Sequence, residues 1–204
     1  MDILGIDEAG RGSVLGPLVI AGVIVPEKMN KILERMGVKD SKRLAPHRRT
    51  ILSRKLKKMF DYEVVVISAL QIDEMRAGGI NLNDIEKNAM RDLIIKMNPE
   101  KAIVDAVDVK AERFQDNLCQ STGVNVIAEH KADDKYIQVS AASIIAKAER
   151  DAQIEDINKE YIKMGGIGSG YPSDPTTKEF LTNFTYDEMP DFVRRSWATV
   201  AKMK

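Results

Sequence analysis

Two β-branched apolar runs near the amino terminus, and the glycine-rich segment between them, most constrain how this chain can fold. The runs are residues 3–6 and residues 18–25 (LVIAGVIV), and EAGRGSVLGP occupies residues 8–17 between them. Runs of this kind predict strands, and the intervening glycines permit the chain to reverse. We therefore expect two strands joined around a hairpin, the second of them ended by Pro26.

The rest of the chain alternates helical and strand patterns. Between Asn81 and Met97, apolar residues recur at spacings of three and four, which predicts an amphipathic helix. Strands that first cluster and later alternate with helices indicate an α/β fold with a mixed central sheet flanked by helices. Because the chain has 204 residues, we expect a single domain. Further helices are predicted over residues 27–36, 46–59, 110–118 and 139–161, from 176 and after 194, and further strands over 62–67, 101–105 and 125–130.

Scarce cysteine and histidine narrow the chemistry that is open to the chain. Cys119 is the only cysteine, which excludes an internal disulfide and thiolate zinc or iron–sulfur sites within one chain. The only imidazoles are His47 and His130, to which the pattern assigns no role, so a metal here is expected to have oxygen ligands. The sequence shows no signal peptide and no apolar run of the roughly 18 residues that a membrane span needs, which predicts a cytoplasmic protein.

Basic residues are concentrated in one tract although the chain as a whole is neutral. The 31 basic and 31 acidic side chains balance, but residues 39–58 hold nine basic residues and one acid, Asp40. Such a tract can follow a phosphate backbone. The alternative is an ordinary solvated helix face, since lysine and arginine are common on exposed helices.

Four carboxylates lie at the ends of predicted strands. Asp7 and Glu8 follow the first strand, Asp105 ends the strand 101–105, and Asp133 follows the strand 125–130. Carboxylates gathered at one sheet edge repel one another and need cations to stay ionised, and Mg²⁺ and Mn²⁺ prefer such oxygen ligands. Two divalent ions would suit in-line phosphodiester hydrolysis, one activating water and the other stabilising the leaving oxygen.

Two considerations weigh against this site. Each of these acids, taken alone, could be a helix cap or a surface residue. In addition, neighbouring residues in a strand point to opposite faces, so Asp7 and Glu8 cannot both face one metal from a regular strand. A bend at Gly10 and Gly12 would redirect Glu8.

Five motifs in a fixed order carry a resemblance to a known family. They are DEAGRG at 7–12, DSKRL at 40–44, EHKADD at 129–134, SAASIIAK at 140–147 and GSGYPSDP at 168–175. Together with their separations and the chain length, they resemble ribonuclease HII in its short archaeal form. The resemblance covers essentially the whole chain.

The resemblance implies a fold and an activity. The fold is ribonuclease H-like, here with a core of about residues 1–150 and a helical carboxyl-terminal extension from about residue 151. The activity is endonucleolytic cleavage of RNA paired to DNA, including cleavage on the 5′ side of single ribonucleotides in duplex DNA, leaving a 5′-phosphate and a 3′-hydroxyl. The family's acidic residues match Asp7, Glu8 and Asp105 as ligands of Mg²⁺ or Mn²⁺, and Asp133 as the residue that completes the second ion and positions water.

The resemblance also implies substrate contacts. The family's glycine–basic–glycine loop approaches the minor groove and contacts the 2′-hydroxyl that distinguishes RNA from DNA. The tyrosine of its GSGYP loop packs on the deoxyribose that follows the ribonucleotide, and phosphate contacts fall in its DSK segment. The matching residues here are Gly10, Arg11, Gly12, Ser41, Lys42 and Tyr171.

Two departures from the family and two rival functions qualify this reading. Ser13 stands where proline is usual, and the final segment SWATVAKMK lacks the glutamine- and aromatic-containing tail that binds a sliding clamp, which puts clamp binding in doubt. We expect a monomer. A 3′–5′ exonuclease of the same fold is one rival, and a hybrid-binding module without catalysis is the other. Four clustered acids near phosphates argue against the second.

Overall fold

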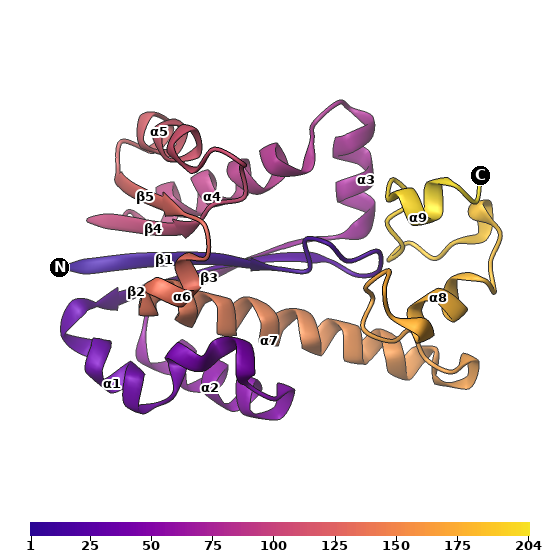
Figure 1. Ribbon diagram of the computed structural model, residues 1–204, viewed down its shortest axis with the longest axis horizontal. Coiled ribbons are helices and arrows are strands. Elements are labelled where there is room, and N and C mark those ends of the chain that lie inside the picture. Colours follow the sequence, from indigo (N-terminus) through magenta and orange to yellow (C-terminus); the bar gives the residue numbers. More distant parts are fainter. The chain divides into compact units, whose positions relative to one another are not determined.

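Five strands form one mixed sheet in the order β3-β2-β1-β4-β5 in the computed structural model, which describes residues 1–39 and 42–204 (Figure 1). β1 pairs antiparallel with β2 and parallel with β4, and β4 pairs parallel with β5. The predicted hairpin and mixed sheet are therefore confirmed. The strands are β1 (Asp2–Ala9), β2 (Leu18–Pro26), β3 (Tyr62–Ile67), β4 (Lys101–Asp105) and β5 (Asn125–Glu129).

The chain divides into two compact units, each with its own apolar core. The division crosses the predicted boundary near residue 151, and the single domain with a helical extension stays a prediction. Unit 1 comprises Met1–Ala9, Val19–Val65 and Asn83–Ala148, and unit 2 comprises Gly10–Leu18, Val66–Leu82 and Glu149–Lys204.

In unit 1, helices cover both faces of the sheet. Figure 1 shows α4 (Leu82–Met97) and α5 (Ala111–Thr122) on one side, with α1 (Asn30–Arg35), α2 (Pro46–Met59) and the start of α7 (Ile137–Glu160) on the other. On the α2 and α7 side, buried apolar residues of β2, α2 and α7 form one core cluster.

Close contact between α7 and the sheet depends on a glycine. A Cβ added at Gly5 of β1 would lie 2.2 Å from the backbone of Gln138 in α7, which is far inside contact distance. The small residues Ala141, Ala142 and Ala146 of the same helix are fully buried against the core. The helix therefore lies directly on β1, and residues one turn further along it come close to the end of that strand.

Unit 2 has a core built around aromatic rings. Tyr161 contacts Phe180 and Phe192 edge-on, with ring centroids 5.2 and 5.4 Å apart. Leu15 and Val193 form an isolated β-bridge beside them. The remaining helices of the structure are η1 (Glu27–Met29), η2 (Val38–Arg43), α3 (Ala69–Ala77), α6 (Ala132–Lys135), η3 (Ile162–Met164), α8 (Pro175–Leu181), η4 (Tyr186–Glu188) and α9 (Ala198–Ala201).

Several predicted bounds were wrong. β1 extends to Ala9 because its pairing with β2 continues to that residue, so Asp7 and Glu8 lie inside the strand rather than after it. The helix predicted over 27–36 is instead a 3₁₀ turn followed by α1, and α3 and α6 were not predicted. Within the described residues, no helix combines the length and apolar character that a bilayer span requires.

Candidate active site

Asp7 and Asp105 lie at the carboxyl ends of two adjacent parallel strands. Ile6 of β1 is opposite Val104 of β4, so the next residues, Asp7 and Asp105, follow at the same edge. Asp7 is only 4% exposed. The predicted gathering of strand-end acids therefore holds for this pair.

Asp133 reaches the same edge from a short helix. Lys131 has a left-handed backbone, φ 57°, which turns the chain from β5 into α6. The amide of Ala132 then donates to Asp105 Oδ1 at 3.3 Å, and Asp133 itself is 5% exposed. The turn thus places a third acid beside the end of β4.

The acids are close enough to disfavour one another's charge. Burial raises the pKa of Asp7 well above its usual value, the charges of Glu8 and Asp105 raise it further, and the nearby Ser143 side chain of α7 offsets part of this. Burial also raises the pKa of Asp105, with a smaller contribution from the charge of Asp133. A cluster of carboxyl groups like this needs nearby positive charge to stay ionised.

Glu8 keeps the regular strand geometry. It lies opposite Ile20 in the β1–β2 ladder, and its amide donates to Asp7 Oδ1 at 2.9 Å. The chain turns only at Gly10, where φ is +85°. The bend expected at the glycines is therefore present, but it comes after the β1–β2 pairing has ended at Ala9. It therefore does not redirect Glu8.

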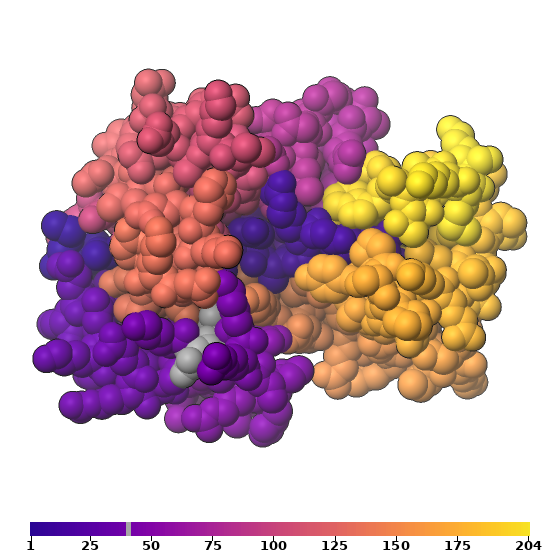
Figure 2. Space-filling view, in the orientation of Figure 1, coloured from indigo at the N-terminus to yellow at the C-terminus, as the bar shows by residue number. Residues whose placement is uncertain are grey.

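Lys42 contacts the acidic cluster directly. Its Nζ lies 3.2 Å from Asp133 Oδ1 and 2.7 Å from Asp134 Oδ1, and the hydrogen bond to Asp134 raises the pKa of Lys42. In Figure 2 purple surface from the amino-terminal third of the chain adjoins the salmon surface of segment 125–136. The sequence predicted Lys42 as a phosphate contact and did not predict these partners. Ser41, its predicted companion, lies outside the described residues.

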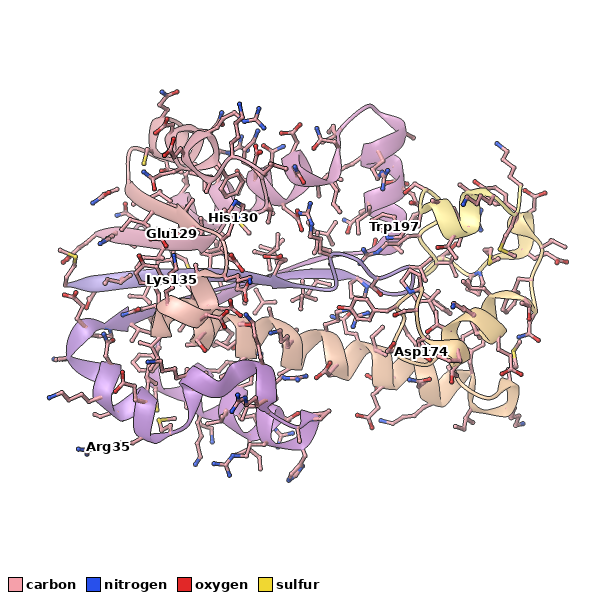
Figure 3. The ribbon with its side chains drawn as sticks, in the orientation of Figure 1. Arg35, Glu129, His130, Lys135, Asp174 and Trp197 are labelled. Atoms are coloured by element: carbon pink, nitrogen blue, oxygen red, sulfur yellow. The ribbon has the colours of Figure 1, made fainter. Side chains whose placement is uncertain are left out.

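Glu129, the last residue of β5, already has two partners within the protein. Glu129 pairs with Lys135 and accepts a 2.6 Å hydrogen bond from the Tyr136 hydroxyl, and both contacts lower its pKa (Figure 3). Glu129 belongs to the EHKADD motif but is therefore engaged elsewhere. Asp7 and Asp105, in contrast, have raised pKa values.

A divalent cation fits the chemistry of these donors, although the side chains are not arranged as a ready ligand cage. In residues 1–39 and 42–204, no three Asp, Glu, His or Cys side chains form a group that would hold one metal ion as they stand. The donors that the edge offers are carboxylate oxygens, which Mg²⁺ and Mn²⁺ prefer, and the raised pKa values of Asp7 and Asp105 reflect burial together with the negative charge of neighbouring acids. The ligand assignment stays a prediction.

The glycine loop belongs to unit 2, where it forms a tight turn. The amide of Ser13 donates to the carbonyl of Gly10 at 3.3 Å, so Arg11 and Gly12 are the central residues of the turn. A Cβ at Gly10 would lie 2.4 Å from Arg150 Nε, whereas a Cβ at Gly12 would meet nothing within 4 Å. Gly10 is therefore required by the fold, and Gly12 borders open space.

The Tyr171 loop is held against this turn. The carbonyl of Gly170 accepts from the amides of Val14 at 2.8 Å and Leu15 at 3.1 Å. The Ser13 hydroxyl lies 2.8 Å from the same carbonyl and accepts from Arg150 at 2.6 Å. Tyr171 itself is 37% exposed. Unit 2 thus brings two of the predicted substrate-contacting segments together.

The sequence reasoning missed two buried arginines in unit 2. Arg150 is 5% exposed and lies 5.0 Å from the Tyr171 ring, and Arg194 is fully buried beside Trp197. Arginine is common on helix and loop surfaces, so no pattern marked these two as internal. Ser13, which the sequence treated only as a departure from proline, links Arg150 to the loop carbonyls.

The sheet order and the acidic edge define a metal-dependent nuclease of ribonuclease H-like fold. The ribonuclease HII family model matches residues 4–200, and the chain belongs to this family. It is therefore a metal-dependent endoribonuclease of RNase H type 2.

Similar proteins span almost the same length. Ribonuclease HII of Methanobrevibacter smithii is 79% identical over 204 residues, covering 100% of this chain and 99% of that protein. The crystal structure of ribonuclease H2 from Pyrococcus horikoshii OT3 has a TM-score of 0.89 at 43% identity and covers 100% of this chain and 97% of that one. The PCNA:RNase HII complex from Archaeoglobus fulgidus contains a chain with a TM-score of 0.87 at 43% identity, covering 97% and 95%.

Proposed function

We propose that this chain cleaves the RNA strand of RNA–DNA hybrids and cuts on the 5′ side of ribonucleotides embedded in duplex DNA. The products are a 5′-phosphate and a 3′-hydroxyl. The observation that carries the proposal is the acidic edge, where Asp7 lies near the end of β1, Asp105 ends the adjacent parallel strand β4, and Asp133 joins them from α6. Buried acids with raised pKa values suit a site that binds cations and a phosphate between them.

The edge residues have separate parts in this proposal. Asp7, Glu8 and Asp105 would hold Mg²⁺ or Mn²⁺, and Asp133 would complete the second ion position and orient the attacking water. Because Asp7 and Glu8 point to opposite faces of the regular strand, Glu8 would join only after the end of β1 adjusts to the bound metal. Bound divalent cations supply an activated water and stabilisation of the leaving oxygen. The α6 turn fixes Asp133 because the Ala132 amide is tied to Asp105. Ser143 of α7 lies beside Asp7 and favours its ionised form.

Substrate recognition is assigned to the other predicted residues. Lys42, together with Ser41, contacts the phosphate backbone. The loop of Gly10, Arg11 and Gly12 reads the 2′-hydroxyl, and the open space beside Gly12 admits a close ligand. The partly exposed ring of Tyr171 packs on the sugar that follows the ribonucleotide.

Partners and surroundings of the enzyme stay predictions. The similar chain from A. fulgidus was solved as a complex with PCNA. For this chain the sequence puts clamp binding in doubt and predicts a monomer and a cytoplasmic location. Calorimetric titration with the sliding clamp of a related archaeon checks the first of these, and sedimentation checks the second.

One cleavage experiment tests the proposed reaction. A duplex of DNA with one internal ribonucleotide and both ends blocked is incubated with Mg²⁺, Mn²⁺ or EDTA, and the cut is mapped at nucleotide resolution. A single cut 5′ of the ribonucleotide, absent in EDTA, is expected. Degradation that requires a free end would instead identify the exonuclease, and binding without any cut would identify the non-catalytic module.

A further inference from the structure

Arg194 is a fully buried arginine whose hydrogen bonds go to the glycine loop. Its Nη2 donates to the carbonyl of Gly10 at 2.7 Å, its Nη1 to the carbonyl of Arg11 at 3.0 Å, and its Nε to the carbonyl of Gly16 at 3.1 Å. One planar guanidinium therefore fixes three peptide groups, two of which belong to the tight turn.

The two loop carbonyls determine where the loop amides point. In a trans peptide the N–H of one residue points opposite to the C=O of the residue before it, and the described residues contain no cis peptide. With the carbonyls of Gly10 and Arg11 both directed at Arg194, the amides of Arg11 and Gly12 are both directed away from it. Consecutive amides that share a direction form a concave site for an oxygen acceptor.

Arg194 is itself held from two sides. Its guanidinium lies 4.7 Å from the centre of the Trp197 ring, and its amide donates to the carbonyl of Val14 at 2.9 Å. The following turn is tied to α3, because Asp73 accepts from the amide of Arg195 at 2.7 Å and from the hydroxyl of Ser196 at 2.5 Å. The arginine has little freedom to move away from the loop.

Burial of this arginine is costly for the fold. Burial lowers the pKa of Arg194 to about 9, yet the group stays charged at neutral pH. An apolar side chain of similar size would avoid that cost but would leave the three carbonyls without this donor. The buried charge therefore serves to fix the conformation of the loop, which is the segment with a proposed substrate role.

We propose that Arg194 is a positioning residue, which sets the amides of Arg11 and Gly12 toward the 2′-hydroxyl of the substrate ribonucleotide. The inference rests on the proposed function and adds the residue that pre-arranges the loop. Arg194 does not touch the substrate itself. It acts through the peptide groups of Gly10 and Arg11.

The test compares Arg194→Lys with Arg195→Lys. Lysine keeps the charge but cannot bind the three carbonyls as one planar group, whereas the control changes a neighbour whose guanidinium donates to Met189 rather than to the loop. The measurement is the ratio of dissociation constants for two duplexes in EDTA, one all-DNA and one with a single ribonucleotide. Arg194→Lys should lower this preference about tenfold, the loss expected when two neutral amide hydrogen bonds to the 2′-hydroxyl are misaligned, and Arg195→Lys should keep it.

The outcomes separate the inference from the proposed function. A wild-type protein with no preference and no cut would contradict the proposed function itself. A wild-type preference that survives in Arg194→Lys, with only a lower melting temperature, would overturn the positioning role alone.

If Arg194→Lys does not fold, a measurement on the wild-type protein still tests the inference. Hydrogen exchange at the amides of Arg11 and Gly12 should slow when the ribonucleotide duplex binds and slow much less with the all-DNA duplex. Equal protection by the two duplexes would overturn the inference.

Discussion

The ammonium of Lys42 lies 3.2 Å from the Asp133 carboxylate and 2.7 Å from that of Asp134, so the acidic edge contains one cation of the protein's own. Lys42 is about half exposed, which lets its long side chain reach other partners. A divalent ion would compete with Lys42 for the Asp133 carboxylate, and a phosphate would compete with the carboxylates for Lys42. Lys42 is thus placed to exchange a carboxylate for a phosphate when substrate binds.

Lys42→Ala tests that exchange. We expect weaker binding to every duplex, a salt dependence that is shallower by roughly one counterion, and an unchanged cut position. The measurement is the slope of log affinity against log salt concentration. Lys135→Ala is the matched control, because this lysine of α6 pairs with Glu129 instead of the edge acids. An unchanged slope in Lys42→Ala would mean that the lysine stays on its carboxylates.

Asp7→Asn tests the catalytic edge. The substitution removes a charge but preserves shape, so cleavage should fall below a few per cent of wild type while hybrid binding is largely kept. Activity is measured on the blocked single-ribonucleotide duplex, and binding by fluorescence anisotropy in EDTA. Asp116→Asn, an exposed change on α5, should leave both unaffected. Cleavage above a few per cent in Asp7→Asn would remove Asp7 from the metal site.

The same variant should be more stable than wild type when metal is withheld. Burial and the charges of Glu8 and Asp105 raise the pKa of Asp7 in the fold, so its ionised form opposes folding. In EDTA at neutral pH, Asp7→Asn should raise the melting temperature by about 2–4 °C, which corresponds to roughly 1 kcal/mol in a chain of this size.

The pH dependence of that difference has a definite sign. A carboxyl whose pKa is raised on folding stabilises the fold only while protonated, fully below its unfolded pKa, and this stability is lost as pH rises through the folded value. As the pH falls, the stability of the wild type should therefore rise relative to that of Asp7→Asn. Added Mg²⁺ or Mn²⁺ should stabilise the wild type more than it stabilises Asp7→Asn. A stability difference independent of pH and metal would contradict the charge-repulsion account of the edge.

Local patterns were sufficient for much of the fold. β3, β4 and α2 begin and end at the predicted residues, because β-branched runs and a proline at the first helical turn define them locally. The end of β1 was not predicted, because its last residues are held in the strand by pairing with β2, and a local sequence pattern does not show that pairing. α3 had a readable signal that was overlooked, the capping box of Ser68 and Gln71.

The site residues that lie on strands could be predicted from the sequence, whereas those placed by tertiary contacts could not. Asp7 and Asp105 were found because parallel strands end at one edge. The pairing of Lys42 with Asp134 depends on how two distant segments fold together, and the internal position of Arg194 depends on carbonyls that only the folded loop presents. Charge type alone does not distinguish a buried arginine from a solvated one.

Tyr171→Ala tests how the enzyme senses the junction between RNA and DNA. The loop is anchored through Gly170, Arg150 lies 5.0 Å from the tyrosine ring, and the ring remains 37% exposed, so it can contact a sugar without rearrangement. An aromatic contact of this kind is worth about 1 kcal/mol at the low end of stacking values, or roughly fivefold in rate. Tyr171→Ala should therefore lose at least about fivefold more activity on a single embedded ribonucleotide than on a long RNA–DNA hybrid.

Tyr171→Phe separates the ring from its hydroxyl. Phenylalanine keeps the ring that faces the sugar, so under the junction-sensing role it should retain the substrate preference of wild type. If the hydroxyl instead ties the loop backbone, Tyr171→Phe and Tyr171→Ala should both lower the melting temperature and reduce cleavage of the two substrates equally. Parallel kcat/KM measurements on both substrates, with melting curves for each variant, decide between these roles. Equal losses on the two substrates in Tyr171→Ala would reject junction sensing, because a ring that only stabilises the loop has no means of distinguishing one sugar from another.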